Sequence, residues 1–537
     1  RCAWLELRVA CIYGEYGYTT AGDASPTMGC CCLCCRMDSN HEVSSLLLQL
    51  PDPCLVAVLR CCAEHPRSLF SAARAHSRLH QAAVLAASSI TAIVSCQQQA
   101  DSILQYLTIH GQHVNSLAIQ SAAETGMVTL FQLPHSTLQG LSSLSLDNLV
   151  IDLQRGLGRN LLGSWAVLKQ LQLHNCKLHD EYFGLQGALV QLPRLQHLSL
   201  GFHFDTLYYE RRSLEIPSSA LQALKQLTYL ELENSRFEDR HVDSLQPLQG
   251  LTNLQDLRLD IVNTRIIRAS ALLGFQHLTC LKVSSLGSCK FEPGALAGKT
   301  LLQNLQVVVF HDNHGDPTEL MSHLARLQQL TYLQLQGTIQ SWMDAEVTTY
   351  SALTACSRLQ HLDVSHNVLP AGVWQHVFPA GRQLPHLRAL DISSVIGPEV
   401  APEGSRLVSC CPKLRSLIMN HLQYTVGALA PLSGLSGLHE LRLTFCNSQQ
   451  SEPSMFEVLE AVGQLTGLMQ LTIWNVYPRT ALHSDHTQLM QLTQLKQLTY
   501  LEFGYSDDYS RKFFQVRCFL LYFTQLLELP QLDSRHM

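Results

Sequence analysis

The stretch Leu224–Leu232 reads LKQLTYLEL and returns almost unchanged as LKQLTYLEF at Leu495–Phe503. Looser copies of the same pattern include LPRLQHLSL at Leu192–Leu200 and LTNLQDLRL at Leu251–Leu259. Each copy ends in an apolar-x-apolar triplet, and the side chains of a β-strand point alternately to its two faces. Every copy therefore predicts one short strand with two inward residues and one outward residue between them.

The pattern occurs fifteen times, at intervals of 24 to 32 residues. The first inward residues of the triplets are Leu117, Leu144, Leu171, Leu198, Leu230, Leu257, Leu281, Val308, Leu333, Leu362, Leu390, Leu417, Leu441, Leu471 and Leu501. A repeat of this length and pattern is the signature of leucine-rich repeats. It predicts an α/β fold over residues 111–510, a horseshoe-shaped solenoid with a parallel concave sheet and a helical convex side.

The residues between the inward pairs indicate what the concave face presents. They are Ala118, Ser145, Gln172, Ser199, Glu231, Arg258, Lys282, Val309, Gln334, Asp363, Asp391, Ile418, Arg442, Thr472 and Glu502. Within and beside this row we select a candidate target-binding set: Tyr229, Glu231, Glu233, Asp256, Arg258, Asp260, Lys282, Tyr332, Asp363, Asp391 and Trp474. Its acidic residues suit a peptide that contains Arg or Lys. The alternative is that charges of both signs only keep an exposed sheet soluble.

The chain has 537 residues, a formal net charge of −6 and only 15% charged residues. No strong basic field is present, which argues against binding nucleic acid through phosphate contacts. No uninterrupted run of about 18 to 20 apolar residues occurs, so we expect no transmembrane helix and no membrane partner.

Sequence motifs of catalysis are absent: the chain contains no Gly-x-Ser-x-Gly, His-Glu-x-x-His or Gly-x-Gly-x-x-Gly. GALAGKT at Gly294–Thr300 is one residue too short between its glycines for a phosphate-binding loop, so we expect a repeat turn there. His483, Asp485 and His486 form a possible metal site, although a solvated loop is the simpler interpretation. We therefore expect no enzymatic activity, no cofactor and no metal.

Ten of the 19 cysteines lie before residue 63, and the others are scattered. Cys176 and Cys446 come after the inward pair of their repeats, at the position where leucine-rich repeats take an inward Asn or Cys. We expect both to be buried free thiols. This use of cysteine is typical of a reduced compartment, so we expect a cytoplasmic protein, with the nucleus or a cilium axoneme left open.

Residues 1–43 carry five cysteines between Cys30 and Cys35 and show no helical or strand period. We interpret them as a disordered leader or a gene-model artefact, with the true start at Met28 or Met37. A start at Met28 would give Met-Gly-Cys-Cys-Cys-Leu, which resembles an acylated N-terminus except that Leu33 stands where Ser or Thr is preferred.

Residues 44–86 predict a small all-α domain. Pro51 and Pro53 suit the first turn of a helix, with Asp52 at its positive end. Leu55, Val58 and Leu59 continue this helix at helical spacing. A second helix is expected from about Ser68 and includes Leu69 and Leu79. A helical linker is expected over 87–110, and an amphipathic helix should cap the solenoid over 511–537.

The segment LPDPCLVAVL, followed by SLFSAARAHSRLHQAA, resembles an F-box. Leu50, Pro51, Asp52, Leu69 and Arg78 fit its pattern, together with Leu55, Val58 and Leu59, whereas Ala75 and Leu79 replace the usual Val and bulky aromatic. A helical cap for the solenoid is the alternative interpretation.

The resemblance to F-box leucine-rich-repeat proteins, with repeats like those of ribonuclease inhibitor, implies a substrate-recognition subunit of a Skp-cullin-F-box ubiquitin ligase. Its partners would be a Skp-type adaptor with its cullin complex and an unknown target protein. The residues implied in adaptor binding are Leu50, Pro51, Leu55, Val58, Leu59, Leu69 and Leu79. The alternative function is a non-enzymatic scaffold, cytoplasmic or axonemal, in which the first helices are only a cap.

Overall fold

A computed structural model describes most of the repeat region and part of the helical segment before it. The residues described are 48–61, 76–122 except 87, 128–151 except 131, 132 and 135, 165–178, 189–202, 214–261 except 217, 238–244, 246 and 247, 266–309 except 286–288, 318–339, 346–397, 402–422, 429–445, 455–474, 492–507 except 493, and 512–519. They belong to two units, residues 1–184 and 185–537, each described by itself below. Among these residues no helix has the length and apolar character needed to cross a membrane.

The first unit begins with a pair of packed helices, α2 (Asp52–Cys61) and α4 (Ser77–Ala86). The sheet then starts at β1 (Ser89–Val94), which pairs in parallel with β2 (Ser116–Ser121). Helix α5 (Gln97–His110) and the short 3-10 turn η2 (Gly111–His113) connect these two strands. The sheet continues through β4 (Ser143–Asp147) and β6 (Gln170–Leu178). A second strip is formed by β3 (Val128–Leu130), β5 (Leu149–Ile151) and the end of β6.

The expectation of a helical linker over 87–110 was therefore partly wrong. Its second half is helix α5, but its first half is strand β1, in which Ile90, Ala92 and Val94 are buried and the residues between them are exposed. This alternation buries one face of a strand, and Ile and Val favour that conformation. The repeat sheet consequently starts one strand earlier than the leucine pattern indicates.

The second unit contains twelve consecutive parallel strands among its described residues. They are β7 (His197–Phe202), β9 (Tyr229–Phe237), β10 (Asp256–Ile261), β12 (Cys280–Ser285), β14 (Asn304–Val309), β15 (Tyr332–Gln336), β16 (His361–Asp363), β17 (Ala389–Asp391), β18 (Ser416–Leu422), β19 (Glu440–Phe445), β20 (Gln470–Trp474) and β21 (Tyr500–Asp507). Short strands pair beside this sheet: β8 (Leu214–Ile216) with β9, and β11 (Ile266–Ile267) with β13 (Lys290–Phe291). The result confirms the leucine-rich-repeat solenoid.

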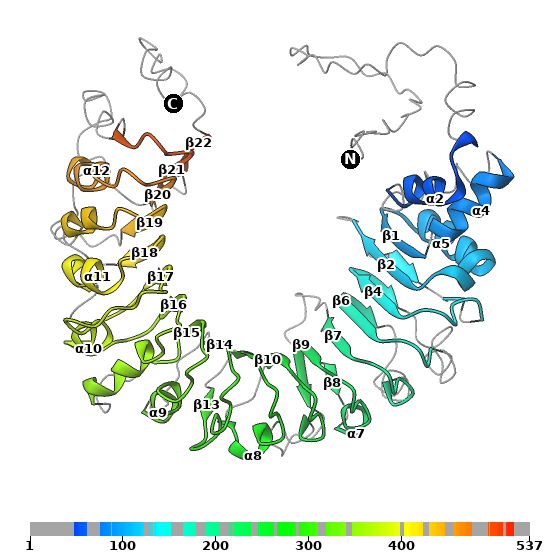
Figure 1. The fold of residues 1–537 in the computed structure, drawn as a ribbon, viewed down its shortest axis with the longest axis horizontal. Coiled ribbons are helices and arrows are strands. Elements are labelled where there is room, and N and C mark those ends of the chain that lie inside the picture. The colour runs from blue at the N-terminus through cyan, green and yellow to red at the C-terminus, as the bar shows by residue number, and fades with distance from the viewer. Residues whose placement is uncertain are drawn as a thin grey trace, which may run out of the picture. The chain divides into compact units, whose positions relative to one another are not determined.

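The segments that return from one strand to the next contain short helices. They are α7 (Ser218–Gln222), α8 (Ala269–Leu272), α9 (Thr318–Leu324), η5 (Val347–Thr354), α10 (Val373–Val377), α11 (Gly404–Cys410), η7 (Ala430–Gly434) and α12 (Met455–Gly463). Within the second unit the strands line the inner side of a curve and these helices line its outer side (Figure 1). Helices are wider than strands, so packing one helix behind each strand bends the sheet.

The core is a ladder of leucines held in register. Leu230, Leu257 and Leu281 pair across β9, β10 and β12 and are fully buried. Each strand adds two such residues, and no single repeat could bury them without its neighbours. Stacking therefore supplies the stability of the fold.

A residue with left-handed backbone recurs at the same position in four of the described repeats. Asn148, Asn175, His366 and Ser394 occupy equivalent positions, and all have positive φ, from 50° to 57°. The next position points inward: Asn367 is fully buried and bonds the backbone of Ile339, Val364 and Ser365. Cys176 takes this inward position in its own repeat and contacts the carbonyls of Leu146 and His174.

Cys176 is a buried free thiol, as expected, and burial raises its pKa to about 12. Cys446 lies outside the described residues. The inward position thus holds a thiol in this repeat and an asparagine in the repeat of Asn367.

One repeat was placed wrongly in the sequence. The strand β14 aligns Leu305 and Val307 with the inward pair Leu281 and Val283 of β12, so the outward residue is Gln306 and not Val309. Val309 is 4% exposed. The run Val307–Val309 fits an apolar alternation in either register, and only pairing with the neighbouring strands selects one.

The C-terminal cap also differs from the expected helix. The strand β22 (Lys512–Phe519) pairs antiparallel with β21 and covers the free edge of that strand. Aromatic and β-branched residues favour strands, and an uncovered sheet edge leaves backbone groups without partners. Residues 520–537 lie outside the described range.

Candidate functional site

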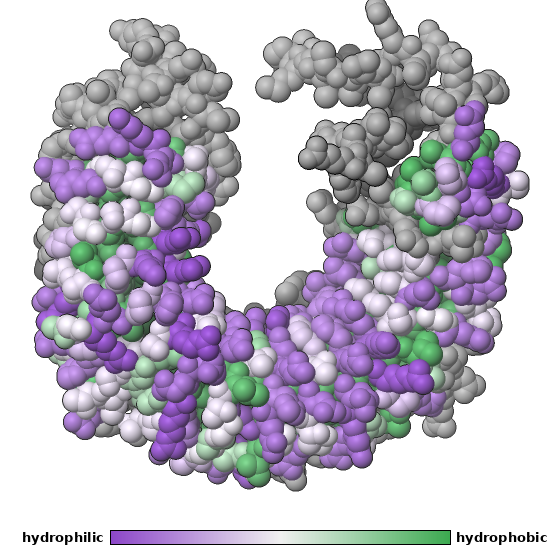
Figure 2. Space-filling model, in the orientation of Figure 1, coloured by the Kyte–Doolittle hydropathy of each residue, from purple (hydrophilic) through white to green (hydrophobic). Residues whose placement is uncertain are grey.

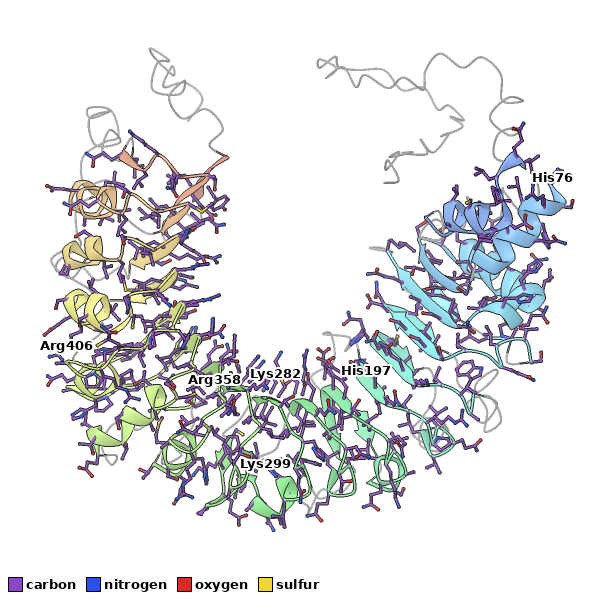
Figure 3. The ribbon with its side chains drawn as sticks, viewed as in Figure 1. His76, His197, Lys282, Lys299, Arg358 and Arg406 are labelled. Atoms are coloured by element: carbon purple, nitrogen blue, oxygen red, sulfur yellow. The ribbon has the colours of Figure 1, made fainter. Side chains whose placement is uncertain are left out.

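Along the inner rim of the second unit, Figure 2 shows mainly hydrophilic residues. Two parallel rows cross its strands. The outward residues form a middle row, in which Glu231, Arg258 and Lys282 are register neighbours on β9, β10 and β12. The residue before each inward pair forms a first row, which includes Tyr229, Asp256 and the labelled His197 (Figure 3).

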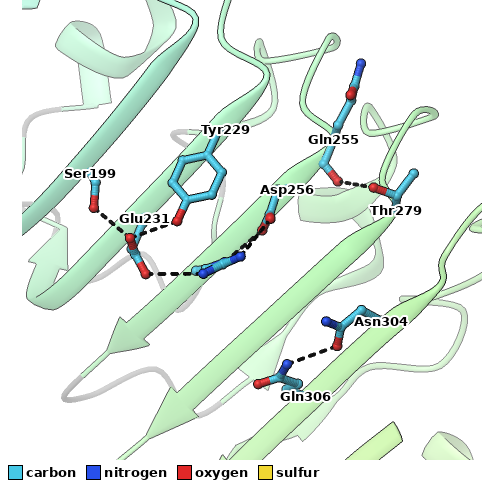
Figure 4. Close-up of polar contacts among 9 residues, drawn as sticks. Ser199, Tyr229, Glu231, Gln255, Asp256, Thr279, Asn304 and Gln306 are labelled. Atoms are coloured by element: carbon cyan, nitrogen blue, oxygen red, sulfur yellow. Dashed lines mark hydrogen bonds and ion pairs between the residues drawn. The ribbon is translucent and has the colours of Figure 1, made fainter. Parts of the chain in front are cut away.

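Five predicted or neighbouring residues form one hydrogen-bonded cluster, which we call the acidic cluster: Ser199, Tyr229, Glu231, Asp256 and Arg258 (Figure 4). One carboxylate oxygen of Glu231 accepts hydrogen bonds from the hydroxyls of Ser199 (2.7 Å) and Tyr229 (2.8 Å). The other lies 3.9 Å from the Arg258 guanidinium. Arg258 also donates two bonds of 3.1 Å to Asp256. Four members of the predicted target-binding set, Tyr229, Glu231, Asp256 and Arg258, are thus linked to one another, while their role in binding a target stays a prediction.

The electrostatics of this cluster change its expected role. The bidentate hydrogen bond to Asp256 raises the pKa of Arg258, and burial together with the bond to Glu231 raises the pKa of Tyr229. Both groups therefore keep their protons at neutral pH. The negative charges expected to attract a basic peptide are already paired with a cation of the chain itself.

The remaining charged members of the predicted set lie beside this cluster. Asp260 is half-buried, and burial raises its pKa while the charge of Lys282 opposes the rise. Lys282 forms no hydrogen bond or salt bridge with any residue that the structure describes. Glu233 lies opposite Gly201, where an added Cβ would meet its carboxylate at 2.6 Å. Gly201 therefore leaves the space that this side chain occupies.

Two tyrosines are each braced by a histidine from an adjacent strand. His197 and Tyr229 stack with their ring centroids 3.8 Å apart, and Tyr332 and His361 stack at 4.2 Å. Arg258 also lies over the Tyr229 ring, 5.1 Å from its centroid. His197 was not among the predicted target-binding residues, although its place directly before an inward leucine marks it as a member of the first row.

Asp363 and Asp391 are register neighbours, as predicted, but they bond backbone groups. Asp363 is 6% exposed and accepts hydrogen bonds from the backbone N–H of Ser365 and the amide of Gln334. Asp391 accepts the N–H of Ser393 (2.9 Å). Burial raises the pKa of Asp391, as does the negative charge of Asp363. These carboxylates stabilise the turn after their strands, a common use of Asp.

Trp474, the last of the predicted set, is half-buried on β20, in register with Thr444 and Gly504.

A second charged group on β18 and β19 was not selected from the sequence. Ser416 and Arg442 both bond Glu440, each with an interatomic distance of 2.7 Å. The Arg442–Glu440 contact repeats that of Arg258 with Asp256, in which the two residues are two positions apart on one strand.

The helical pair of the first unit contains most of the predicted adaptor-binding residues. Leu55, Leu59 and Leu79 are buried, Leu50 and Val58 are half-buried and Pro51 is exposed. Leu69 lies outside the described residues. Among the described residues of this set, those open to a partner without rearrangement of the helices are therefore Leu50, Pro51 and Val58.

Arg78 fixes how the two helices meet. Its guanidinium donates to Asp52 (2.6 and 2.9 Å) and to the carbonyls of Leu48 and Leu50. The Leu-Pro-Asp opening is thus fastened to the second helix, and α2 begins at Asp52 as the sequence indicates.

No group of three or more metal-binding side chains occurs in the part of the chain that the structure describes. His483, Asp485 and His486 lie outside it. The segment Gly294–Thr300 forms a turn with positive φ at Gly294 and Gly298, as expected. Lys299 is 4% exposed, and its ammonium lies 3.5 Å from the carbonyl of Leu273, so it folds into the repeat core.

No protein-family model matches the chain, and no curated protein matches it. An internalin (inlF) from Listeria monocytogenes is similar in structure, with 17% identity, a TM-score of 0.39, and coverage of 70% of this chain and 93% of that one. TLR13 in its ssRNA13 complex has 15% identity, a TM-score of 0.41, and coverage of 78% and 55%.

The ectodomain of the plant membrane receptor kinase GASSHO1/SCHENGEN3 from Arabidopsis thaliana, in complex with CASPARIAN STRIP INTEGRITY FACTOR 2, has 17% identity and a TM-score of 0.38. The match covers 73% of this chain and 45% of that one. The assignment of the leucine-rich-repeat fold rests on the parallel register and recurring triplets of the chain itself.

Proposed function

We propose that this chain is a non-catalytic recognition protein that binds a protein partner on the concave face of its second unit. The observation that carries the proposal is the row of polar and aromatic side chains across β7 to β16, held in fixed orientations by contacts within strands and between neighbouring strands. Pre-oriented side chains lose less conformational entropy on binding than mobile ones do, which favours recognition.

We further propose that the α2–α4 pair is an F-box-like docking element for a Skp-type adaptor of a cullin ubiquitin ligase. The support is the Leu-Pro-Asp opening, the Arg78–Asp52 contact and the position of this pair directly before a repeat array. Adaptor binding would use Leu50, Pro51, Val58 and Leu69, while Leu55, Leu59 and Leu79 hold the two helices together. The chain would then bring its target close to the conjugating enzyme by raising the effective concentration of that target.

The test is a pull-down of the full chain with purified Skp adaptor. The variant Leu50→Ala, Pro51→Ala, Val58→Ala should lose binding because it removes apolar surface that faces solvent. A matched control, Ile109→Ala with Leu273→Ala, removes exposed apolar side chains elsewhere and should bind normally. No binding by the folded wild-type chain, or equal binding by the triple variant, would reject the adaptor assignment.

A scaffold protein is the second candidate function. The burial of Leu55, Leu59 and Leu79 favours it, because a helical pair that serves only as the end of a solenoid needs no more than such a core. Under this alternative, loss of the three solvent-facing residues would leave partner binding unchanged.

A further inference from the structure

The region between the two braced tyrosines has an approximate mirror symmetry. Going from β7 to β16, the first row reads His197, Tyr229, Asp256, Cys280, Asn304, Tyr332 and His361. On both sides of Cys280 an acid or amide is followed by a tyrosine and then by the histidine that stacks on it. We call the residues of β10, β12 and β14 between the tyrosines the central platform: Asp256, Arg258, Cys280, Lys282, Asn304 and Gln306.

The two halves of this platform differ in charge. Arg258 donates to Asp256 on its own strand at 3.1 Å, and Gln306 donates to Asn304 in the same arrangement, also at 3.1 Å. The first half is thus an ion pair and the second half its neutral counterpart (Figure 4). Lys282 stands at the centre, in register with Arg258 on one side and Gln306 on the other.

Lys282 is the charge on this platform that lacks a contact partner among the described residues. Arg258 is neutralised by Asp256 at 3.1 Å and approached by Glu231 at 3.9 Å. For Lys282 the nearby carboxylate is Asp260, which lies outside salt-bridge distance and is half-buried. A partner carboxylate would therefore meet Lys282 without displacing any existing ion pair, whereas a basic side chain would have to compete with Arg258 for its acids.

The hydrogen-bond donors beside Lys282 also favour a negatively charged group on the partner. Asn304 and Gln306 both have amide N–H groups beyond the one bond that joins them. The hydroxyl of Tyr332 forms no hydrogen bond with a described residue, and burial raises its pKa, so it remains a donor. Ammonium, amide and phenol donors together suit a carboxylate and its adjacent backbone carbonyls.

We propose that the central platform binds an extended protein segment with an Asp or Glu side chain on Lys282, between Tyr229 and Tyr332. Four strand spacings of about 4.8 Å separate the two tyrosines, roughly 19 Å. An extended chain advances about 3.4 Å per residue, so about six residues span the platform. This proposal rests on the recognition function above and reverses the basic-peptide preference expected from the sequence.

The test selects peptides from a displayed library of random dodecapeptides on the immobilised full chain. The wild type should recover peptides enriched in Asp and Glu. Affinity of a recovered peptide, measured by fluorescence anisotropy, should fall about tenfold for Lys282→Gln. Lys282→Glu should select peptides enriched in Lys and Arg. A matched control, Lys225→Glu, makes the same charge change at an exposed position off the platform and should select as wild type does.

The unfolding midpoint of each variant is first compared with that of the wild type. If Lys282→Glu fails to fold, the affinity of Lys282→Gln still tests the proposal. Recovery of basic peptides by the wild type, acidic selection that persists in Lys282→Glu, or no enrichment by the folded chain would overturn the proposal. Adaptor binding is scored on the same preparations. If the chain selects acidic peptides but does not bind the adaptor, only the ligase assignment is rejected. If it binds the adaptor but does not select acidic peptides, only the platform proposal is rejected.

Discussion

Glu231 of the acidic cluster and the aspartates Asp363 and Asp391 on β16 and β17 occupy the same outward position of the repeat but have different roles. Glu231 bonds side chains of three neighbouring residues on the open face. Asp363 and Asp391 turn to the backbone of Ser365 and Ser393. The difference lies in the residues at the end of the strand, because an Asp-x-Ser sequence forms a tight turn that needs a carboxylate. An acidic outward residue therefore indicates recognition only where no turn uses it.

The largest expected effect comes from the turn itself. Asn367→Ala removes the acceptor of the Ile339 N–H and the donor to Val364 and Ser365, all within the core. Leaving those groups without partners should lower the free energy of unfolding by about 3 kcal/mol. Urea denaturation followed by circular dichroism measures it. The control Asn304→Ala, on the open face, should change stability by less than about 0.5 kcal/mol.

Removing one acid from each region should separate stability from binding. Asp363→Ala leaves the buried Ser365 N–H without its acceptor and should cost about 1–2 kcal/mol of stability. Glu231→Ala leaves Arg258 bonded to Asp256 and frees the hydroxyl of the half-buried Tyr229, so that Ser199 is the one fully buried partner it deprives, and its cost should be smaller. Equal losses in the same urea titration would break the distinction between the two regions.

Matched tyrosines sharpen the comparison further. Tyr229 and Tyr500 donate the same bond to Glu231 and Glu502, at 2.8 and 2.7 Å. Replacing either by Phe should lower the unfolding free energy by about 0.5–1 kcal/mol. Only Tyr229→Phe should also weaken peptide binding to the central platform, because only Tyr229 borders it. Anisotropy measurements on both variants decide this, and equal binding losses would contradict the placement.

The smallest effect concerns pH. Burial and Asp363 raise the pKa of Asp391 in the folded chain, so its ionisation opposes folding above that pKa. Asp391→Asn keeps an acceptor for Ser393 and removes the charge, which should raise stability at pH 7 by less than about 1 kcal/mol. The gain should fade as the pH falls through the folded pKa towards the ordinary carboxyl value near 4. Urea midpoints at pH 7 and pH 4 test this; a gain that grew on acidification would show the reverse shift.

Sequence patterns predicted much of this fold because each strand repeats one apolar alternation. The prediction was wrong where a second alternation competed or leucine was absent. At Val307–Val309 two registers fit equally, and in β1 the inward residues are Ile90, Ala92 and Val94. The Lys512–Phe519 segment was assigned as a helix because its aromatics fit that spacing, while the need to cover the edge of β21 is visible only in three dimensions.

The candidate site was predictable in position but not in chemistry. The outward row located Glu231, Arg258 and Lys282 as neighbours, and the structure confirms their register. Which charges pair depends on side-chain reach: Arg258 folds back to Asp256 on its own strand, which leaves Lys282 without a contact partner among the described residues. The residue spacing alone could not determine this choice.

The most direct test of the recognition surface compares peptide selection on two conservative variants. The dodecapeptide library is selected on Glu231→Gln and on Asp363→Asn, with the wild-type chain alongside. We predict that Glu231→Gln alters the recovered sequences, because it weakens the hydrogen bond from Tyr229 and removes the ion pair with Arg258. Asp363→Asn should recover the wild-type set. An unchanged set for Glu231→Gln together with an altered set for Asp363→Asn would contradict the assignment of recognition to the acidic cluster and its neighbours.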